Sequence, residues 1–371
     1  MNRNKFIKPD WGKCNINISA TLAEFLGAPN KNSTLPVLKE SLKKDFKNVV
    51  FICFDGLGIY PIEKNLAPDN FLRKNIVQTL TSTFPSTTNA TTSLANNQLP
   101  LEHGWFGWSM HFKDLNRNIN IFLNSDSWTN EKIEIAYSPL GEIDYYFDNA
   151  TSNHEISTVF PNYVKVSHHE RNHIFSGQAD FFETIQKICN RNGKQFIYAY
   201  YPEPDQTMHE FGVTSNEAKA VITSISKSLQ ELLENTKNTL YVITADHGQI
   251  DVEGYVELYK DKKLYEMLEI YPFLEARAVA FKVKKGRKEE FEKYFKSKYG
   301  EDFKLYKTKE LLRANIFGGF GLKADLLGDY IAVGTYTHKI ALIKPDSHAF
   351  KGHHASLTEE MLVPLIVIEN A

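Results

Sequence analysis

Three short, uninterrupted apolar runs constrain most strongly what this chain can fold into. They cover residues 49–54, 196–201 and 240–244, and each ends at a polar cluster that contains an aspartate. Runs of this length are typical of strands that are buried on both faces, as in parallel sheets. Residues 216–235 lie between the second and third runs and carry apolar residues at helical spacing. The chain is therefore predicted to form an α/β fold, with a doubly wound, mostly parallel sheet and helices on both faces.

An aspartate follows each of the three predicted strands, namely Asp55, Asp205 and Asp246. In open α/β sheets, ligands gather outside the carboxyl ends of the strands, so residues far apart in sequence can share one site. The alternative for any single aspartate is a helix cap or a turn, which aspartate often forms. Three such aspartates with histidines beside them favour a common functional site.

The composition is that of an ordinary globular protein. The chain has 371 residues, of which 42% are hydrophobic and 24% are charged, and its formal net charge is −2. These values exclude a collagen-like, coiled-coil or wholly disordered chain, and no strongly basic stretch indicates a nucleic acid partner. Three widely spaced cysteines form neither a disulfide framework nor a CxxC zinc pair. Because the sequence has no signal-peptide pattern and no apolar run of about 18 residues, no membrane association is expected and the cytoplasm is the predicted compartment.

Residues 1–371 are predicted to form a single catalytic domain with two inserted cap segments, at about 113–180 and 260–330. The first segment is rich in Asn, Ser and His. The second is expected to contain a strand at 276–283 and a helix at 287–298, before the chain returns to the core at 330–333. Segments of this length in a compact protein are usually functional, so these two are expected to cover the site and to define the substrate.

Histidines and carboxylates recur at spacings that suit metal ligands. Asp205 and His209 are four residues apart, so on a helix their side chains share one face. Asp246 and His247 directly follow a predicted strand, and two adjacent histidines lie in the small-residue turn at 352–356. A mixture of carboxylate and imidazole ligands suits Zn²⁺, with Mn²⁺ as the main competitor. A lone histidine is more often a surface or capping residue, so the metal hypothesis depends on the whole set.

The stretch 82–97 is unusually rich in hydroxyl side chains. Pro85 precedes a predicted helix, Ser86 is expected to cap it, and Ala90 and Leu94 are expected to pack inward. A hydroxyl at this helix start lies at the positive end of the helix dipole, and a metal would complete the lowering of its pKa. The alternative is a capping segment without chemistry.

Taken together, these motifs resemble the alkaline phosphatase superfamily and, within it, the type I phosphodiesterase/nucleotide pyrophosphatase branch. The resemblance covers about residues 48–112, 195–250 and 325–370, and its motifs keep the order of the family. It implies a doubly wound α/β core that holds two zinc ions and a metal-bound threonine or serine nucleophile. The matching motifs are Phe54-Asp55-Gly56, the threonine-rich helix start, Glu102-His103-Gly104, Pro204-Asp205 with His209-Glu210-Phe211-Gly212, Ala245-Asp246-His247-Gly248 and Gly352-His353-His354.

Carried over residue by residue, the resemblance implies two sets of metal ligands. His354 is preferred to His353, because the turn of the family reads Gly, any residue, His and then a small residue. One ion would be held by Asp205, His209 and His354, and the other by Asp55, Asp246, His247 and the oxygen of the nucleophile, Thr87.

The nucleophile is assigned by counting along the same resemblance. In the family it lies ten residues before the turn that closes its helix, and seven further residues lead to His-Gly, so counting back from Gly104 selects Thr87. The Thr-Phe-Pro pattern that is common among the diesterases would select Thr83 instead. Thr88 is the third option.

One position departs from the pattern of the family. Diesterases of this branch have an Asn a few residues after His-Gly, where it helps to bind a non-bridging phosphate oxygen, and Trp108 takes that place here. The indole could line a pocket for a flat group or pack in the core. If it lines the phosphoryl pocket, we expect weaker diester hydrolysis than in family members that have the Asn.

The resemblance implies a metal-dependent hydrolase of small-molecule phosphate esters. The expected reaction cleaves phosphodiester or nucleotide pyrophosphate bonds by two-zinc catalysis through a phosphothreonine intermediate. The alternatives are a phosphomonoesterase or phosphonate hydrolase on the same scaffold, and a metal-binding module without turnover. A sulfatase is disfavoured because no cysteine lies near Thr87.

Overall fold

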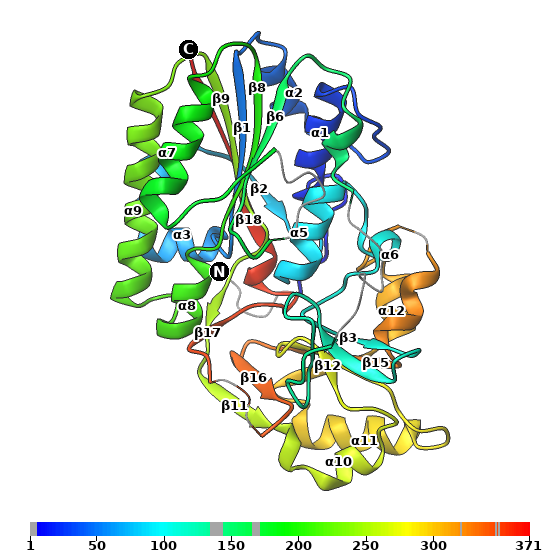
Figure 1. The fold of residues 1–371 in the computed structure, drawn as a ribbon. Helices are drawn as coiled ribbons and strands as arrows, with labels where there is room; N and C mark the ends of the chain where they lie inside the picture. Colours follow the sequence, from blue (N-terminus) through cyan, green and yellow to red (C-terminus); the bar gives the residue numbers. More distant parts are fainter. Residues whose placement is uncertain (1–5, 134–143, 165–170, 320, 346, 348) are drawn as a thin grey trace.

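The computed structural model describes residues 6–133, 144–164, 171–319, 321–345, 347 and 349–371. Two large sheets dominate this part of the chain. Helices cover both faces of the central sheet, and the second sheet lies beyond the carboxyl ends of its parallel strands (Figure 1).

The central sheet has one antiparallel strand among parallel ones. Within the described residues its strands are β1 (Asn48–Phe54), β2 (Ile76–Thr81), β6 (Glu155–Val159), β7 (Asn172–His173), β8 (Gln195–Tyr201), β9 (Thr239–Ala245) and β18 (Leu362–Asn370). They are ordered β2-β18-β9-β1-β8-β6-β7. β1 pairs in parallel with both β8 and β9, whereas β18 runs antiparallel to both β9 and β2. Every residue of β1 and β9 is buried, which explains their continuous apolar sequences.

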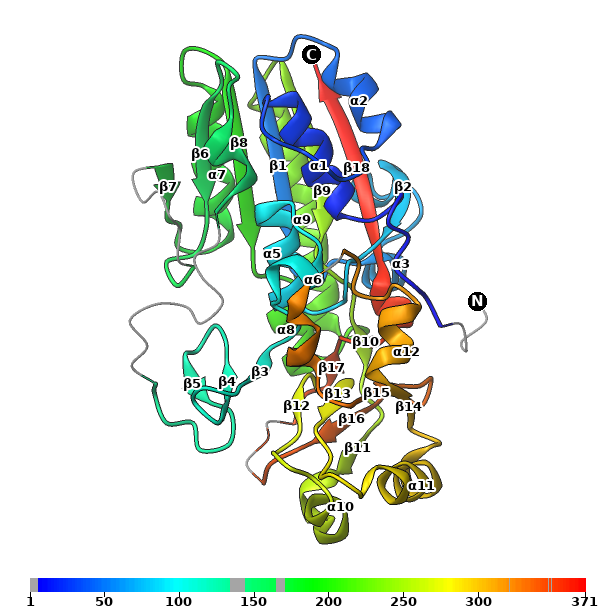
Figure 2. The same ribbon diagram turned by 90° about the vertical axis from the view of Figure 1, so that its right-hand side faces the viewer.

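Helices pack on both faces of the central sheet (Figure 2). α3 (Ile59–Asn65), α7 (Gln178–Cys189) and α9 (Asn216–Glu234) cover one face, and α1 (Ile16–Phe25), α2 (Pro36–Leu42) and α5 (Thr87–Asn96) cover the other (Figure 1). The doubly wound α/β fold predicted from the sequence is therefore confirmed, and the helix predicted at 216–235 is α9. The shorter helices around the central sheet are α4 (Phe71–Lys74), α6 (Pro100–His103) and α8 (Asp205–Phe211).

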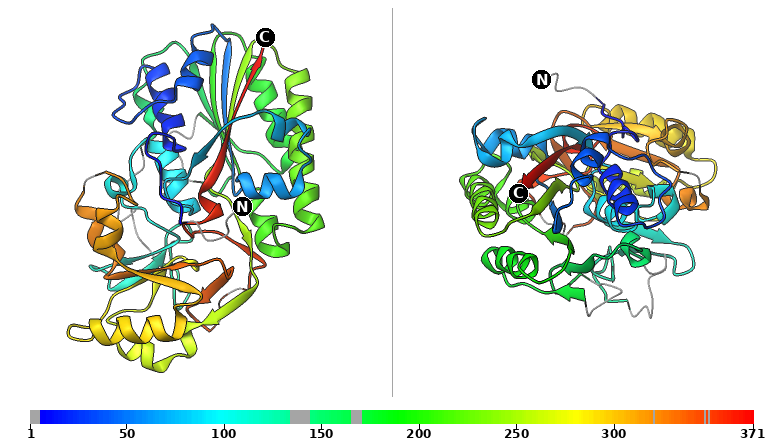
Figure 3. Two further views of the ribbon diagram at one scale, coloured as in Figure 1. Left: turned by 180° about the vertical axis from the view of Figure 1, so that it is seen from behind. Right: turned by 90° about the horizontal axis from the view of Figure 1, so that it is seen from above.

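The second sheet is antiparallel and contributes to two hydrophobic clusters. It lies at the opposite end of the molecule from the C-terminus (Figure 3). It is ordered β14-β15-β13-β12-β3-β4-β5. Its strands are β3 (Ser109–Phe112), β4 (Arg117–Asn120), β5 (Ser125–Asp126), β12 (Phe273–Leu274), β13 (Ala278–Phe281), β14 (Phe303–Lys307) and β15 (Tyr330–Gly334). The neighbouring helices are α10 (Lys262–Glu266), α11 (Lys288–Tyr299) and α12 (Thr308–Arg313), and two small pairings add β10 (Ile250–Asp251) with β17 (Gly352–His353) and β11 (Gly254–Glu257) with β16 (Lys339–Leu342).

Two segments are distributed between the two sheets differently from what the sequence predicts. Residues 330–333 do not return to the central sheet but form β15, between β13 and β14. That prediction is wrong because a short apolar run fits a strand of either sheet, and only the pairing partners decide between them. Residues 113–180 are divided, since β4 and β5 join the second sheet whereas β6 and β7 join the central one. Residues 134–143 and 165–170 of that segment lie outside the described residues.

No helix in the described residues is long and apolar enough to cross a bilayer.

A fully buried ion pair joins the two sheets. Arg277, just before β13, donates from Nε to Glu360 Oε1 at 2.8 Å, and neither side chain is exposed. Glu360 lies two residues before β18, and its backbone oxygen accepts a hydrogen bond from the Gly248 backbone N–H. Arg277 also donates to the carbonyl oxygens of Thr335 and Lys339. Each of the three guanidinium nitrogens therefore donates a hydrogen bond, and the side chain holds the β12–β13 turn against the end of the central sheet.

We predict that Arg277→Met lowers the free energy of unfolding by about 3–5 kcal/mol, because it leaves the Glu360 carboxylate buried without its counter-charge. Urea unfolding would measure the loss. The double variant Arg277→Met/Glu360→Met should recover much of it, since it removes both buried charges. Lys43→Met, which breaks an exposed ion pair with Glu40, is the matched control and should change stability little. An Arg277→Met protein as stable as the wild type would contradict this account.

Candidate active site

The three aspartates predicted to share a site do meet at the carboxyl edge of the central sheet. Asp55 follows β1, Asp246 follows β9, and Asp205 begins α8, which follows β8. The Asp205 backbone N–H donates to the Asp55 backbone oxygen at 3.1 Å. Gly56 has a φ of 71°, and a Cβ atom there would meet Asp205 Cβ at 2.9 Å. A side chain at Gly56 would therefore strain the turn and force the two aspartates apart.

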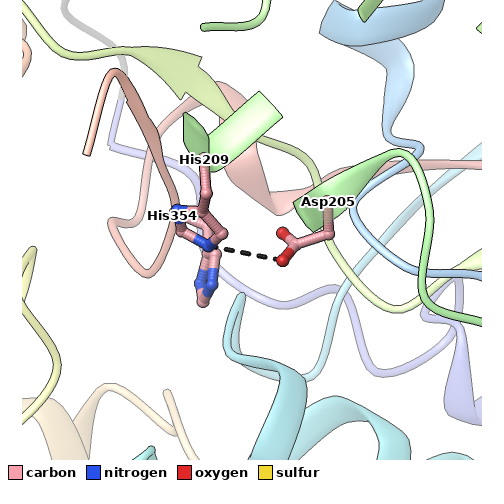
Figure 4. Close-up of side chains that lie close together, drawn as sticks. All are labelled: Asp205, His209 and His354. Carbon is pink, nitrogen blue, oxygen red and sulfur yellow. Dashed lines mark ion pairs between the residues drawn. The ribbon is translucent and has the colours of Figure 1, made fainter. Parts of the chain in front are cut away.

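Asp205, His209 and His354 form one candidate metal-ligand group, in which the ligand atoms all lie within 4.8 Å of one another. Asp205 and His209 share one face of α8, and His209 Nε2 lies 3.3 Å from Asp205 Oδ2 (Figure 4). His354 comes from the loop after β17. The i, i+4 spacing read from the sequence thus places two of these side chains, and the C-terminal loop supplies the third.

Asp55, Asp246 and His247 form a second such group, also within 4.8 Å, and all three are buried. His247 Nε2 lies 3.4 Å from Asp55 Oδ1 and 3.4 Å from Asp246 Oδ2. The rings of His247 and His354 stack with their centroids 3.9 Å apart, so the two groups are neighbours.

Backbone carbonyls orient the three histidines of these groups. The Nδ1 atoms of His209, His247 and His354 lie 2.8, 3.1 and 2.9 Å from the carbonyl oxygens of Gly352, Gly248 and Pro85. A carbonyl can only accept, so each Nδ1 carries the proton and each Nε2 keeps a lone pair. This is the arrangement that metal-ligating histidines usually have.

Each aspartate is held through one oxygen and leaves the other toward the centre of the site. Tyr200 donates to Asp55 Oδ2, and the backbone N–H groups of Gly56 and His247 donate to Asp246 Oδ1. Within the described residues, Asp55 Oδ1 and Asp246 Oδ2 are buried and have no hydrogen-bond partner. Buried carboxylate oxygens without a partner are costly, and a divalent cation is the ligand that would satisfy them. The site therefore fits metal ions.

The carboxylates also perturb one another's protonation. Burial raises the pKa of Asp55 well above its ordinary value, and the charges of Asp246 and Asp205 raise it further. Burial likewise raises the pKa of Asp246. Asp205 differs: burial opposes its charged form, but His209, His354 and His247 together outweigh burial and lower the pKa of Asp205. Three carboxylates this close repel one another unless positive charge lies among them.

Thr87 is the threonine that reaches these groups. It is the first residue of α5, it is partly exposed, and its Oγ1 lies 3.0 Å from His247 Nε2. Because His247 Nδ1 carries the proton, the Thr87 hydroxyl donates to Nε2. Thr83 is fully buried and its hydroxyl donates to Asn89, and Thr88 is also fully buried. Neither alternative hydroxyl lies beside the metal-ligand groups.

Glu275 is a functional candidate that the sequence does not reveal. It lies in the β12–β13 turn, where its Oε1 accepts hydrogen bonds from the Ser86 hydroxyl and from the Trp108 backbone N–H at 2.8 Å. Ser86 was expected to cap α5, but its side chain makes no capping bond because its hydroxyl is turned to Glu275. The sequence signal is weak, since one glutamate between two apolar runs looks like any turn residue.

Trp108 proves to be a surface residue. Its side chain is 37% exposed, and its ring packs edge-on against Phe122 with the centroids 5.9 Å apart. The core packing considered from the sequence is therefore wrong, because Trp108 lies at the start of β3, on the rim of the site. Its backbone N–H, rather than its indole, bonds to Glu275.

His103, from the Glu102-His103-Gly104 motif, supports α5 and does not join the metal-ligand groups. The Trp105 backbone N–H donates to His103 Nδ1 at 2.9 Å. His103 Nε2 must then carry the proton and donate to Ser93 Oγ, also at 2.9 Å. Burial, with the charge of Lys323, lowers the pKa of His103 to about 3. A neutral histidine thus ties the loop after α6 to α5.

Two carboxylate–imidazole groups beside a hydroxyl, at the carboxyl edge of a parallel sheet, define a metal-dependent hydrolase. The chain belongs to the type I phosphodiesterase/nucleotide pyrophosphatase family, whose model matches residues 49–354. The family is metal-dependent and belongs to the alkaline phosphatase superfamily, so the chain is a hydrolase of the phosphoester-cleaving kind. No curated protein sequence matches the chain.

Solved structures share the fold at low sequence identity. Murine ectonucleotide pyrophosphatase/phosphodiesterase 5 aligns with a TM-score of 0.63 and 19% identity, over 86% of this chain and 87% of that one. Its inactive variant in complex with AMP gives a TM-score of 0.62 and 20% identity over the same shares. Phosphonoacetate hydrolase from Sinorhizobium meliloti 1021, in complex with phosphonoformate, gives 0.61 and 14% over 86% of this chain and 89% of that one.

We predict that His103 makes the protein less stable in acid. Its pKa is about 3 when folded and 6.5 when unfolded. The stability that this neutral ring contributes is therefore fully present above pH 6.5 and is lost as the pH falls toward 3. Urea unfolding from about pH 7 to about pH 5 should show a stability slope up to about 1.4 kcal/mol per pH unit steeper in the wild type than in His103→Gln. Equal slopes in the two proteins would rule out a buried neutral His103.

Proposed function

We propose that this protein hydrolyses phosphodiester or nucleotide pyrophosphate bonds of small molecules, with Thr87 as the nucleophile and two zinc ions as cofactors. The observation that carries the proposal is the Thr87 hydroxyl, 3.0 Å from His247 Nε2 and beside two adjoining metal-ligand groups. The cytoplasmic location expected from the sequence stays a prediction.

The ligand assignment follows the two groups. Asp205, His209 and His354 would hold one ion, and Asp55, Asp246 and His247, with the Thr87 oxygen, the other. Three ligands with both imidazole and carboxylate donors suit Zn²⁺, with Mn²⁺ as the competitor. When bound, the ions supply positive charge that lowers the pKa of the attacking hydroxyl and offsets charge on the phosphoryl oxygens.

The residues of the chain supply the remaining chemistry. The Thr87 hydroxyl gives up its proton to solvent as its oxygen attacks phosphorus. The Oγ–P bond forms, the bond to the leaving oxygen breaks, and the leaving oxygen takes up a proton from solvent. Water then cleaves the Oγ–P bond, which releases the product and returns the threonine hydroxyl. α5 directs the free N–H groups of its first turn toward the same place, and a helix start stabilises an anionic phosphoryl group.

A phosphonate hydrolase or phosphomonoesterase is the second candidate. Two observations favour it: a phosphonoacetate hydrolase shares the fold, and Trp108 stands where the diesterases have the amide donor. The murine relative whose inactive variant holds AMP favours the nucleotide reading instead. Hydrolysis of p-nitrophenyl phosphate, bis-p-nitrophenyl phosphate and p-nitrophenyl phenylphosphonate by the zinc-loaded protein would rank the candidates.

We predict that Thr87→Ala lowers kcat by at least about a thousandfold, because it removes the attacking oxygen, while zinc content and melting temperature change little. Thr83→Ala is the matched control. It removes a buried hydroxyl that bonds to Asn89, so it should lower the melting temperature but retain most of the turnover. If Thr83→Ala proves inactive and Thr87→Ala active, the nucleophile has been assigned to the wrong threonine.

We predict that elemental analysis finds two zinc ions per chain and that His354→Gln retains only one of them. His353→Gln is the matched control, because His353 is equally buried but its Nδ1 accepts the His354 backbone N–H and lies outside both groups. It should keep both ions. Trace metal in the wild type, with activity indifferent to strong chelators, would contradict the two-ion proposal.

A further inference from the structure

Glu275 places a carboxylate from the second sheet beside the nucleophile's end of α5. Its Oε1 is bonded to the hydroxyl of Ser86, the residue immediately before Thr87. Its charge also reaches one of the candidate ligands: burial lowers the pKa of His209, whereas Asp205, the bond to Gly352 and, as the smallest effect, Glu275 raise it. Glu275 is therefore bonded to the residue that precedes Thr87, at the N-terminal end of α5.

The surrounding structure holds Glu275 in this position. Leu274, just before it, has a φ of 88°, a conformation that a leucine adopts only under constraint. Arg277, two residues later, is locked to Glu360. Gly107 lets the glutamate approach, since a Cβ atom there would lie 2.8 Å from Leu274 Cδ1 and 3.2 Å from Glu275 Cγ. The strained turn at Leu274, the buried ion pair of Arg277 and the small residue Gly107 together fix the position of the Glu275 carboxylate.

No lysine or arginine within the described ranges forms an ion pair with Glu275; its bonds come from a hydroxyl and a backbone N–H. Burial raises the pKa of Glu275, whereas the bonds from Ser86 and Trp108 and the nearby His247 and His209 favour its charged form. The charged carboxylate is an acceptor that can take a further hydrogen bond. A negatively charged substituent of a substrate would be repelled there, whereas an ammonium group would be attracted and could donate a hydrogen bond to it.

We propose that Glu275 selects substrates by charge, by binding a cationic, hydrogen-bond-donating substituent on the phosphorus-containing group. The preferred substrates are then zwitterionic phosphoesters that carry an ammonium a few bonds from phosphorus. This inference rests on the proposed phosphoester hydrolysis, and it names the substrate class for that same site. Glu275 acts here as a specificity residue and takes no part in breaking the P–O bond.

A pair of ligands that differ only in charge tests the proposal. p-Nitrophenyl 2-aminoethyl phosphate and p-nitrophenyl propyl phosphate have the same leaving group and nearly the same size, and only the first carries an ammonium. Binding to the zinc-loaded Thr87→Ala protein, measured by calorimetry, avoids turnover. A charge-assisted hydrogen bond of about 1.5–3 kcal/mol corresponds to a preference of roughly 10- to 100-fold for the aminoethyl ligand.

Glu275→Gln is the decisive variant, because its amide oxygen can still accept from Ser86 and Trp108 while the negative charge is gone. In the Thr87→Ala/Glu275→Gln protein the preference should fall to about onefold, mainly through weaker binding of the aminoethyl ligand. Glu257→Gln, at an exposed surface carboxylate, is the control and should leave the preference unchanged. Equal binding of the two ligands to Thr87→Ala, or a preference that survives Glu275→Gln, would overturn the proposal.

Turnover of the same two esters separates this inference from the proposed function. If the wild type hydrolyses both esters with equal kcat/KM and Thr87→Ala hydrolyses neither, the proposed function stands and the role of Glu275 fails. If the charge preference in binding is present but no ester is cleaved, the role of Glu275 stands and the proposed function fails.

Discussion

Electrostatic repulsion among three closely spaced carboxylates, two of them buried, is the constraint on which the architecture of this site depends. Asp55, Asp205 and Asp246 are brought together because β1 lies between β8 and β9, with which it pairs in parallel, so their carboxyl ends converge. A fold that brings like charges together must fix the position of each carboxylate and balance their total negative charge. Tyr200, Gln249 and backbone N–H groups hold one oxygen of each aspartate, and the remaining oxygens turn toward the histidines. Divalent cations bound among these oxygens would balance the negative charge of the three aspartates.

Backbone carbonyl oxygens fix the orientation of the three histidine rings in the site. Each of the three histidines in the candidate metal-ligand groups donates a hydrogen bond from its Nδ1–H to a backbone carbonyl oxygen. The His354 ring donates a hydrogen bond to the backbone oxygen of Pro85, two residues before the start of α5. A ligand of one group is thereby linked to the segment that carries Thr87, so metal site and nucleophile are positioned by the same contacts.

Local patterns were sufficient to predict the parts of the site that depend on short-range geometry. The apolar runs identified β1, β8 and β9, because buried parallel strands need continuous apolar residues. The i, i+4 spacing of Asp205 and His209 anticipated a shared helical face. Contacts between distant segments could not be predicted in this way. Residues 330–333 carry an apolar pattern that fits either sheet, and Glu275 gains its role from Ser86, 189 residues earlier in the chain. A hydroxyl-rich segment likewise offers several threonines. Counting along the family motif selects Thr87, and in the structure its partial exposure and its contact with His247 distinguish it from Thr83 and Thr88.

The origin of Glu275 in the second sheet has a consequence for how such an enzyme can change. All the metal ligands come from loops and helices around the central sheet, whereas the residue proposed to sense substrate charge comes from the β12–β13 turn. The Arg277–Glu360 pair fixes that turn to the end of the central sheet without touching a ligand. A substitution at position 275 can therefore alter which phosphoester fits while the three aspartates and three histidines keep their geometry. On this proposal, the residues for hydrolysis lie around the central sheet and the residue for substrate selection lies in the second sheet. The buried Arg277–Glu360 ion pair holds these two parts of the site in a fixed relative position.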